Sequence, residues 1–306
     1  MATRTELNKE KQKELLDEEK RENRQKSIIL VFKLLLFILI FSTLLFFYIT
    51  YVSNAKIVVN EQRLVSKKIP DNFNGTKIIQ FSDLHFGTTI FKKELDDLVD
   101  IINDRNPDIV LFTGDLIDKE YKLESKEQEA IINSLKRINA NIGKYAISGD
   151  EDKEEFNTIL NQSNFLILNN DYDLIYKDNN NPILLVGLSS SLSNNIDTNS
   201  AYKYFKEQTH NSDIYTITIL HEPDSVDNIL SSYSSDLFLA GHSHNGQIRI
   251  PYFGTIFRKN GATKYYNEYY EIDDSKLFIS GGIGTNGNGI RLFTHPSINF
   301  FRLSNN

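Results

Sequence analysis

Short apolar runs, rich in β-branched residues, recur along the chain after residue 77 and are separated by longer mixed stretches. Runs of about four to eight such residues, bounded by polar or glycine residues, are typical of buried β-strands. The pattern therefore predicts strands at residues 78–81, 109–112, 145–148, 183–186, 214–220 and 237–240.

Two of the intervening stretches have a helical pattern. Residues 92–104 and 126–139 place apolar side chains three and four positions apart, which puts them on one face of an α-helix. Strand–helix–strand units of this kind join parallel strands through right-handed crossovers. The chain is therefore predicted to be an α/β protein.

The helical pattern fades after residue 237, and strands dominate the rest of the chain. This shift predicts a second sheet packed against the first. No internal repeat and no further domain boundary is visible in the sequence. The later strands are predicted at residues 247–250, 276–280, 290–293 and 298–303.

The longest apolar run lies near the N-terminus, at residues 28–52, and Lys33 is its only charged residue. As a helix this run would be about 37 Å long, enough to cross a hydrocarbon core of about 30 Å. A cleaved signal peptide is the alternative, because a small-x-small site follows at residues 53–55, but the run exceeds the roughly 7–15 residues of a signal core. We expect a charged cytoplasmic segment at 1–27, a transmembrane helix at 28–52 and one catalytic domain at 53–306.

Basic residues are somewhat more numerous before the apolar run than after it. By the positive-inside rule, the N-terminal segment then faces the cytoplasm. The expected location is the cell membrane, with a single pass and an extracytoplasmic catalytic domain. The basic residues nearest the run are Lys13, Lys20, Arg21, Arg24 and Lys26 before it, and Lys56, Arg63 and Lys67 after it.

The chain has a formal net charge of −7 and contains no cysteine. Nucleic acid is not expected as a partner, because duplex binding needs a basic surface that displaces counterions. The absence of cysteine excludes disulfides, thiol catalysis and thiolate metal ligands. Any metal ion must therefore be held by histidine, carboxylate or amide groups.

Polar clusters follow the predicted strands, at the edge where open α/β sheets bind ligands. Singly, a Gly-Asp pair is usually a turn or helix cap, and a lone histidine beside a strand is usually a core residue. Together, four of the six histidines and three aspartates at successive strand ends are hard to explain as separate accidents. They fit two divalent ions about 3.5–4 Å apart that share a carboxylate. The candidate ligands are Asp83, His85, Asp115, Asp150, His221, His242 and His244.

These clusters resemble the calcineurin-like metallophosphoesterase family, and within it the membrane-anchored bacterial phosphodiesterase branch. The resemblance implies two mixed sheets packed face to face and flanked by helices, and phosphoester hydrolysis by a hydroxide that bridges two ions. It implies that Asp83, His85 and His244 hold the first ion, that Asp115 bridges, and that Asp150, His221 and His242 hold the second. The matching stretches are FSDLHFG (81–87), FTGDLID (112–118), YAISGDED (145–152), ILHEPD (219–224), AGHSHNGQIRIP (240–251) and GGIGTNGNGIRLF (281–293).

The chain departs from the family at residues 149–152, where Gly-Asn-His-Asp or Gly-Asn-His-Glu is usual and Gly-Asp-Glu-Asp stands here. The carboxylate of Asp150 favours Mn²⁺, a harder ion, with Fe, Zn or Mg as alternatives. Glu151 takes the place of the histidine that protonates the leaving group, and Asp152 lies beside it, so these two are the catalytic candidates. A glutamate near its ordinary pKa of about 4.3 is ionised at neutral pH and then has no proton to donate, so we expect good leaving groups to be favoured.

Two further residues are candidates for substrate contact in the resemblance, namely Arg291 and Asn245. A literal G-x-G-x-x-G at 282–287 is followed by a predicted strand and not by a helix, so no nucleotide cofactor is expected. The predicted function is a phosphodiesterase or pyrophosphatase, with lipid or cell-envelope material as its substrate. The alternatives are a phosphomonoesterase and, because of Asp150 and Glu151, a catalytically impaired metal protein that binds a phosphorylated ligand.

Overall fold

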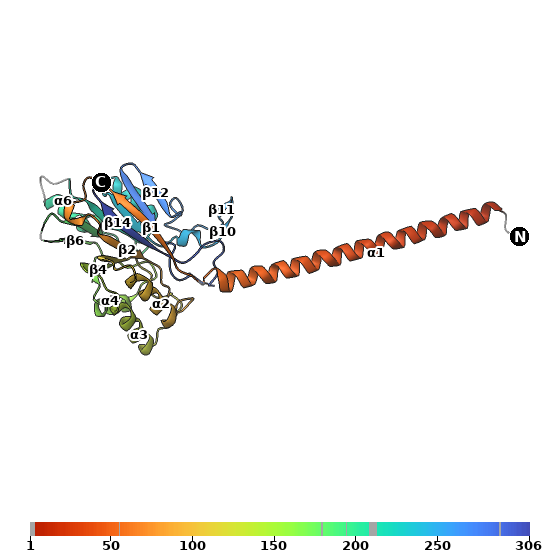
Figure 1. The fold of residues 1–306 in the computed structure, drawn as a ribbon, viewed down its shortest axis with the longest axis horizontal. Helices are drawn as coiled ribbons and strands as arrows, with labels where there is room; N and C mark the ends of the chain where they lie inside the picture. The colour runs from red at the N-terminus through yellow and green to blue at the C-terminus, as the bar shows by residue number, and fades with distance from the viewer. Residues whose placement is uncertain (1–3, 55, 179, 194, 208–212, 288) are drawn as a thin grey trace. The chain divides into compact units, whose positions relative to one another are not determined.

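The computed structural model describes residues 4–54, 56–178, 180–193, 195–207, 213–287 and 289–306 (Figure 1). The chain divides into two compact units, residues 1–51 and 52–306. The first unit is built around one helix, α1 (Arg4–Phe47), which is followed by a π-helical turn at Tyr48–Val52. Among the described residues, one helix is long and apolar enough to cross a membrane, and it covers Lys11–Phe47.

Two six-stranded sheets and a short separate hairpin make up the second unit. The first sheet has the order β1 (Val58–Val65), β14 (Ser297–Ser304), β2 (Lys77–Phe81), β3 (Ile109–Phe112), β4 (Gly143–Ala146) and β5 (Leu166–Ile167). The second has the order β12 (Tyr269–Ile272), β13 (Ser275–Ile279), β9 (Leu237–Ala240), β8 (Thr216–Ile219), β7 (Ile183–Gly187) and β6 (Asp171–Ile175). The hairpin consists of β10 (Arg249–Ile250) and β11 (Gly254–Thr255).

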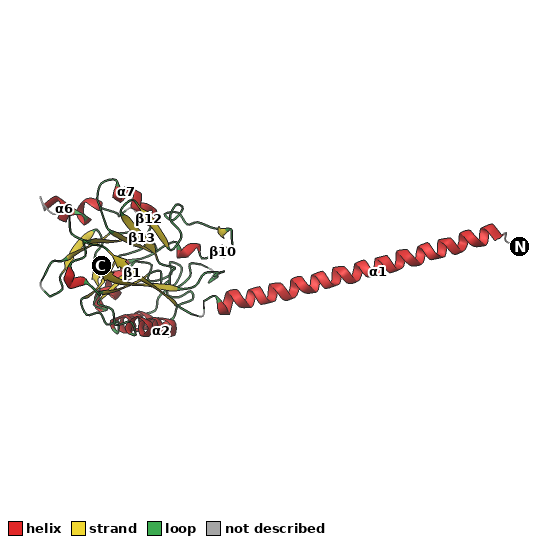
Figure 2. Ribbon diagram, turned by 45° about the horizontal axis from the view of Figure 1, so that its top comes forward, coloured by secondary structure: helices red, strands yellow, loops and turns green. Residues whose placement is uncertain are grey.

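Helices lie on the outer faces of the two sheets, as Figure 2 shows. Strands β2, β3 and β4 are parallel neighbours, and α2 and α3 connect them, as the alternation of patterns predicts. The helices beside the first sheet are α2 (Lys92–Asn103), α3 (Ser125–Lys136) and α4 (Glu154–Gln162). Those beside the second are the shorter α5 (Thr198–Ala201), α6 (Lys203–Glu207) and α7 (Val226–Leu230).

Three hydrophobic cores hold these four layers together. In β2, Ile79 and Phe81 face the helices α2–α4, whereas Ile78 faces the core between the sheets. In β9, Leu239 faces that same central core and Phe238 faces the helices of the second sheet. Because successive side chains of a strand point to opposite faces, a strand covered on both sides is apolar throughout. The two-sheet α/β class predicted from the sequence is confirmed.

The predicted distribution of strands between the sheets is wrong. The second sheet already begins at β6, and the last strand, β14, belongs to the first sheet. There β14 pairs in parallel with β1 and antiparallel with β2. An apolar run shows that a strand is buried, but it carries no information about which strand lies beside it.

The strand predicted at residues 290–293 is also absent. Leu292 makes only an isolated bridge with Ile248, and Phe293 adopts a left-handed φ of 54° that interrupts an extended strand. Edge strand β1 was not predicted, because its polar and half-exposed residues lack a long apolar run.

Candidate metal centre

The seven candidate ligands meet where strands of both sheets end. Asp83 and His85 follow β2, Asp115 follows β3, and Asp150 lies in the loop after β4. From the second sheet, His221 follows β8, and His242 and His244 follow β9. The seven form two groups, each with ligand atoms within 4.8 Å of one another: Asp115, Asp150, His221 and His242, and Asp83, His85 and His244.

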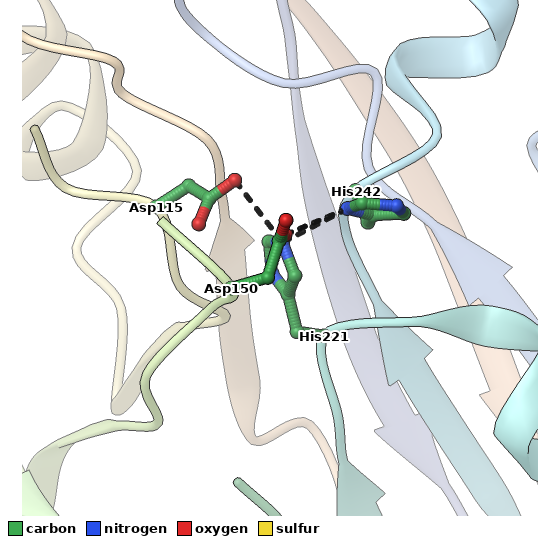
Figure 3. Close-up of side chains that lie close together, drawn as sticks. All are labelled: Asp115, Asp150, His221 and His242. Carbon is green, nitrogen blue, oxygen red and sulfur yellow. Dashed lines mark hydrogen bonds and ion pairs between the residues drawn. The ribbon is translucent and has the colours of Figure 1, made fainter. Parts of the chain in front are cut away.

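The first of these groups surrounds the imidazole of His221 (Figure 3). Its Nε2 atom lies 3.2 Å from Asp115 Oδ2 and 3.2 Å from Asp150 Oδ1. The Nδ1 atom of His242 lies 3.1 Å from the same Asp150 oxygen. Two carboxylate oxygens and two ring nitrogens thus point at one small volume.

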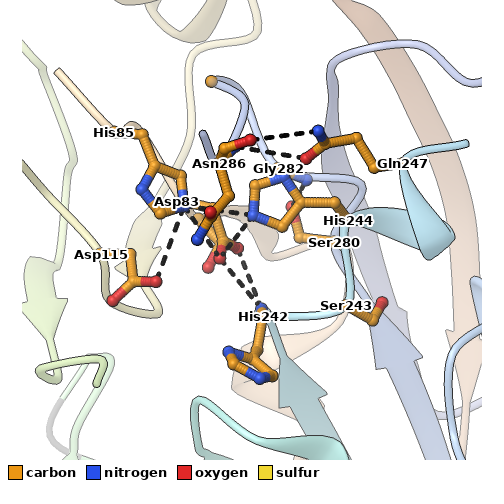
Figure 4. Close-up of polar contacts among 12 residues, drawn as sticks. Asp83, His85, Asp115, His242, Ser243, His244, Gln247, Ser280, Gly282 and Asn286 are labelled. Carbon is orange, nitrogen blue, oxygen red and sulfur yellow. Dashed lines mark hydrogen bonds and ion pairs between the residues drawn. The ribbon is translucent and has the colours of Figure 1, made fainter. Parts of the chain in front are cut away.

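The second group lies beside it (Figure 4). His244 Nε2 is 3.2 Å from Asp83 Oδ1 and 3.2 Å from His85 Nε2. Asp115 Oδ2 is 3.6 Å from His85 Nε2, in addition to its approach to His221 in the other group. One carboxylate oxygen therefore faces both groups.

Two of the histidines are oriented by backbone carbonyl groups. His221 donates its Nδ1–H to the carbonyl of Thr113 at 2.6 Å, and His242 donates its Nε2–H to the carbonyl of Asn260 at 2.7 Å. Each hydrogen bond fixes a tautomer and leaves the opposite nitrogen lone pair directed into its group.

Buried polar atoms without partners test whether cations fit this arrangement. Asp115 Oδ2 and Asp150 Oδ1 are both inaccessible to solvent and receive no hydrogen bond. A buried carboxylate oxygen without a donor is costly, unless a cation lies against it. The donor set of nitrogen and carboxylate oxygen atoms, with these two unpartnered oxygens, fits divalent metal ions.

Much of the centre is built on left-handed backbone. A positive φ is uncommon for residues other than glycine, and residues that have one are frequent at functional sites. At Gly149 a Cβ would lie 2.2 Å from Asp115 Oδ1, so that loop requires glycine. The candidate ligands with positive φ are Asp83 (52°), His85 (41°), Asp115 (58°), His242 (65°) and His244 (50°).

The sequence model of the calcineurin-like phosphoesterase family matches residues 76–246, which include all seven candidate ligands. The chain belongs to the calcineurin-like phosphoesterase family. It is a metallophosphoesterase, a hydrolase of phosphoric ester bonds, as the motifs predict.

Relatives of this phosphoesterase support the predicted branch. The chain is 28% identical over 261 residues to the uncharacterized metallophosphoesterase YkuE of Bacillus subtilis, covering 84% of this chain and 88% of YkuE. It is 23% identical to a transmembrane protein with metallophosphoesterase domain of Danio rerio, covering 76% and 54% of the two chains. A solved structure of the sulfate thiohydrolase SoxB of Thermus thermophilus is 12% identical, with a TM-score of 0.46, covering 74% and 57%. The chain lies in the YkuE-like branch of the family.

Electrostatics keep the central carboxylates of the phosphoesterase ionised. Burial alone would raise the pKa of Asp83, but the facing imidazoles outweigh burial and hold that pKa well below its ordinary value. The same balance between burial and the imidazole of His221 lowers the pKa of Asp115. Ionised carboxylates are the form that binds cations.

Asp152 holds the loops of the phosphoesterase together. Its carboxylate accepts hydrogen bonds from the backbone N–H groups of Asp115, Leu116 and Gly149. Burial, followed by the charge of Asp115, raises the pKa of Asp152 to about 7. The side chain thus ties the loop after β3 to the loop after β4.

The two candidates for substrate contact point elsewhere. Arg291 is completely buried and donates to the carbonyl groups of Gly281, Gly282 and Gly284. Asn245 donates its amide to Glu268 at 3.1 Å. In the described part of the chain, neither side chain forms a hydrogen bond with a side chain of the two ligand groups.

Glu151 lies against His85. Its Oε2 atom is 3.4 Å from His85 Nδ1 and accepts the backbone N–H of Lys119. Its Oε1 atom accepts the amide of Asn286 at 2.6 Å. Both oxygens therefore accept hydrogen bonds from other groups, and Oε2 also lies close to Nδ1 of a candidate ligand without a hydrogen bond to it.

Lys259 was missed by the sequence analysis. Its Nζ atom is buried without a hydrogen-bond partner. Burial and the charge of Lys259 lower the pKa of His244 well below its ordinary value. The next residue, Asn260, accepts a hydrogen bond from His242 through its carbonyl, so the backbone at Lys259 lies beside the candidate metal centre. A lone lysine in a loop gives no sequence signal of such a position.

Proposed function

We propose that this phosphoesterase hydrolyses phosphodiesters or pyrophosphates with two divalent ions held by the seven candidate ligands. The approach of Asp115 Oδ2 to both ligand groups carries this proposal, since a carboxylate shared by two ions defines such a centre. The ions, when bound, supply charge neutralisation for the phosphate and a nucleophilic water at neutral pH. The protein fixes the ligand tautomers and directions.

The ligand chemistry favours Mn²⁺, with Fe, Zn or Mg as alternatives. All seven candidate donors are imidazole nitrogens or carboxylate oxygens, which suit these ions. Asp150 adds a charged oxygen where the family has an amide, which shifts the preference towards a hard cation.

A metal series on the purified full-length chain in detergent tests the function. We expect hydrolysis of bis-p-nitrophenyl phosphate that depends on added metal and is strongest with Mn²⁺. The ratio to p-nitrophenyl phosphate hydrolysis separates a diesterase from a monoesterase. Bound ions without cleavage of either ester would favour the second candidate, an impaired protein that binds a phosphorylated ligand.

We propose that Glu151 orients His85 and does not protonate the leaving group. The 3.4 Å approach of Glu151 Oε2 to His85 Nδ1 supports this role, because a carboxylate that accepts the Nδ1–H of a histidine leaves its Nε2 free for a metal ion. Asp152, whose oxygens are occupied by three backbone N–H groups, keeps the loops of Asp115 and Asp150 in place.

Replacing Glu151 by glutamine distinguishes orientation from proton transfer. If Glu151 orients His85, kcat/KM should fall by about 10–100-fold for p-nitrophenyl, phenyl and methyl esters alike, with weaker metal binding. A loss that grows steeply with the pKa of the leaving group would instead assign general-acid catalysis to Glu151. Glu154→Gln, at the exposed first residue of α4, is the matched control.

Lys259 is proposed as the cation that contacts the substrate phosphate. A buried ammonium without an acceptor is stable only beside an anion, and phosphate oxygens would provide one. Lys259→Met should raise KM for bis-p-nitrophenyl phosphate by about tenfold or more. The neighbouring Arg258, which is exposed and stacks on Tyr266, gives the control Arg258→Met. Equal KM values for both variants would contradict this role.

The organisation proposed for the chain is the charged segment 1–27, the membrane span 28–52 and the catalytic domain 53–306. The apolar helix, together with the transmembrane relative from Danio rerio, supports association with a membrane. We propose an extracytoplasmic domain, from the basic residues that precede the span. Lipid or cell-envelope phosphoesters are then the nearest substrates, and nucleic acid and a nucleotide cofactor are not expected.

A further inference from the structure

The hairpin of β10 and β11 presents a bare apolar tip. Tyr252 and Phe253 are 106% and 88% exposed, and Phe257, just after β11, is 70% exposed. These are the three most exposed large apolar side chains among the described residues of the second unit. Exposed aromatic side chains gathered in one segment mark an interaction surface and are not needed for folding.

The hairpin is attached to the candidate metal centre. Thr255 in β11 donates its hydroxyl to the carbonyl of Gly246, two residues after His244. Contact is so close that a Cβ on Gly246 would lie 2.2 Å from Thr255 Oγ1. After the hairpin, the carbonyl of Asn260 orients His242. The chain on both sides of the tip is therefore anchored to residues of the candidate metal centre.

The same hairpin is attached to the start of the domain. The backbone N–H of Arg249 donates to Leu292, and the hydroxyl of Thr294 donates to Gln247. The buried Ser53 donates its hydroxyl to the carbonyl of Thr294 at 3.1 Å. Ser53 directly follows the proposed membrane span in sequence, so the base of the hairpin is linked to the first residues of the domain after that span.

The chemistry of the tip fits a lipid surface. Tyrosine and phenylalanine side chains have a large apolar surface that can be buried among lipids, and tyrosine is enriched at the membrane–water interface. The exposed Arg258 follows the apolar segment and would meet anionic headgroups. Strands of two residues each offer little backbone edge for pairing with another protein chain.

We propose that the hairpin of residues 249–257 inserts Tyr252 and Phe253 into the bilayer interface and holds the metal centre over phosphoesters of lipid headgroups. The proposal rests on the proposed hydrolase function and on the proposed membrane span. It names membrane lipids as the substrate class, and it gives the hairpin the role of orienting the domain on the bilayer.

Fluorescence tests the insertion without any need for activity. The chain has no tryptophan, so Phe253→Trp in the full-length protein creates a single reporter. In phosphatidylglycerol–phosphatidylcholine vesicles, we expect blue-shifted emission that doxyl-labelled lipid quenches. Tyr176→Trp, beyond the end of β6 and 54% exposed, is the matched control and should stay unquenched. Equal quenching at both positions, or quenching at neither, would overturn the insertion.

Kinetics test the orienting role. In the same vesicles, the double variant Tyr252→Ser, Phe253→Ser should cleave phosphatidyl-p-nitrophenol about fivefold or more slowly than the parent chain. Its hydrolysis of soluble bis-p-nitrophenyl phosphate should stay at the parent rate. Equal cleavage of the lipid by both proteins would overturn the orienting role. A parent chain that cleaves neither ester would refute the hydrolase, while the tryptophan signal would still report on insertion.

Discussion

Asp115→Asn should reduce hydrolysis of bis-p-nitrophenyl phosphate by about 10²–10³-fold or more, a loss on the scale of removing a principal stabilising group. Asp115 Oδ1 accepts the backbone N–H of Glu151 at 3.0 Å, and asparagine can keep this bond through its single oxygen. The NH₂ group would then take the place of Oδ2, which faces both His85 and His221. An amide nitrogen in that position donates hydrogen bonds and cannot bind a cation.

The measurement for Asp115→Asn is kcat across Mn²⁺ concentrations, together with the number of ions bound per chain. Both should fall, because the shared carboxylate serves both ligand groups. Asp97→Asn is the matched control, since Asp97 lies on α2 and pairs with Lys93 at the surface. If Asp115→Asn binds two ions and keeps its full rate, the shared carboxylate is not part of the mechanism.

The candidate ligands were accessible to sequence analysis for a physical reason. Neighbouring parallel strands end at one edge of a sheet, so the candidates after β2, β3 and β4 meet at one edge, and those after β8 and β9 meet at an edge of the other sheet. Asp83 and His85 are separated by one residue, and both lie in the second ligand group. His242 and His244 are also separated by one residue, and they lie in the first and the second group respectively. Strand ends and residue types were sufficient, although the sheet order was not known.

The backbone of the centre was beyond the reach of the sequence. Left-handed φ values occur at Asp83, His85 and His244. Aspartate and histidine adopt this conformation more often than most residues other than glycine, but it remains uncommon for them, so no local pattern predicts where it occurs. The sequence also did not predict that β14 pairs with β1 and β2, because these strands are far apart along the chain.

The role of Arg291 shows the limit of reasoning from residue type. An arginine near a phosphate site suggests a phosphate contact, yet this guanidinium is enclosed by carbonyl groups of the loop at residues 281–284. Gly282 of that loop packs against the centre, because a Cβ there would lie 3.1 Å from both Asp83 Cβ and His244 Nδ1. Arg291 therefore holds the loop that packs against Asp83 and His244.

Arg291→Met should destabilise the folded domain by about 3–5 kcal/mol, because a buried acceptor left without its donor costs about 1–3 kcal/mol and three carbonyl groups lose theirs. The variant leaves the carbonyl groups of Gly281, Gly282 and Gly284 without their donor, inside a region that excludes water. Burial already lowers the pKa of Arg291 to about 10, which shows how strongly these carbonyl groups must compensate for lost hydration. The midpoint of urea unfolding of the full chain in detergent measures the effect.

Arg302→Met is the matched control for this stability prediction. Arg302 lies on β14, pairs with Glu61 at 2.8 Å, and has a half-exposed side chain. Its loss should change the free energy of unfolding by about 1 kcal/mol or less, because exposed ion pairs contribute little. Similar unfolding midpoints for the two variants would contradict the supporting role of Arg291. A large loss for Arg291→Met alone, accompanied by weaker Mn²⁺ binding, would show that the loop it holds supports the group of Asp83, His85 and His244.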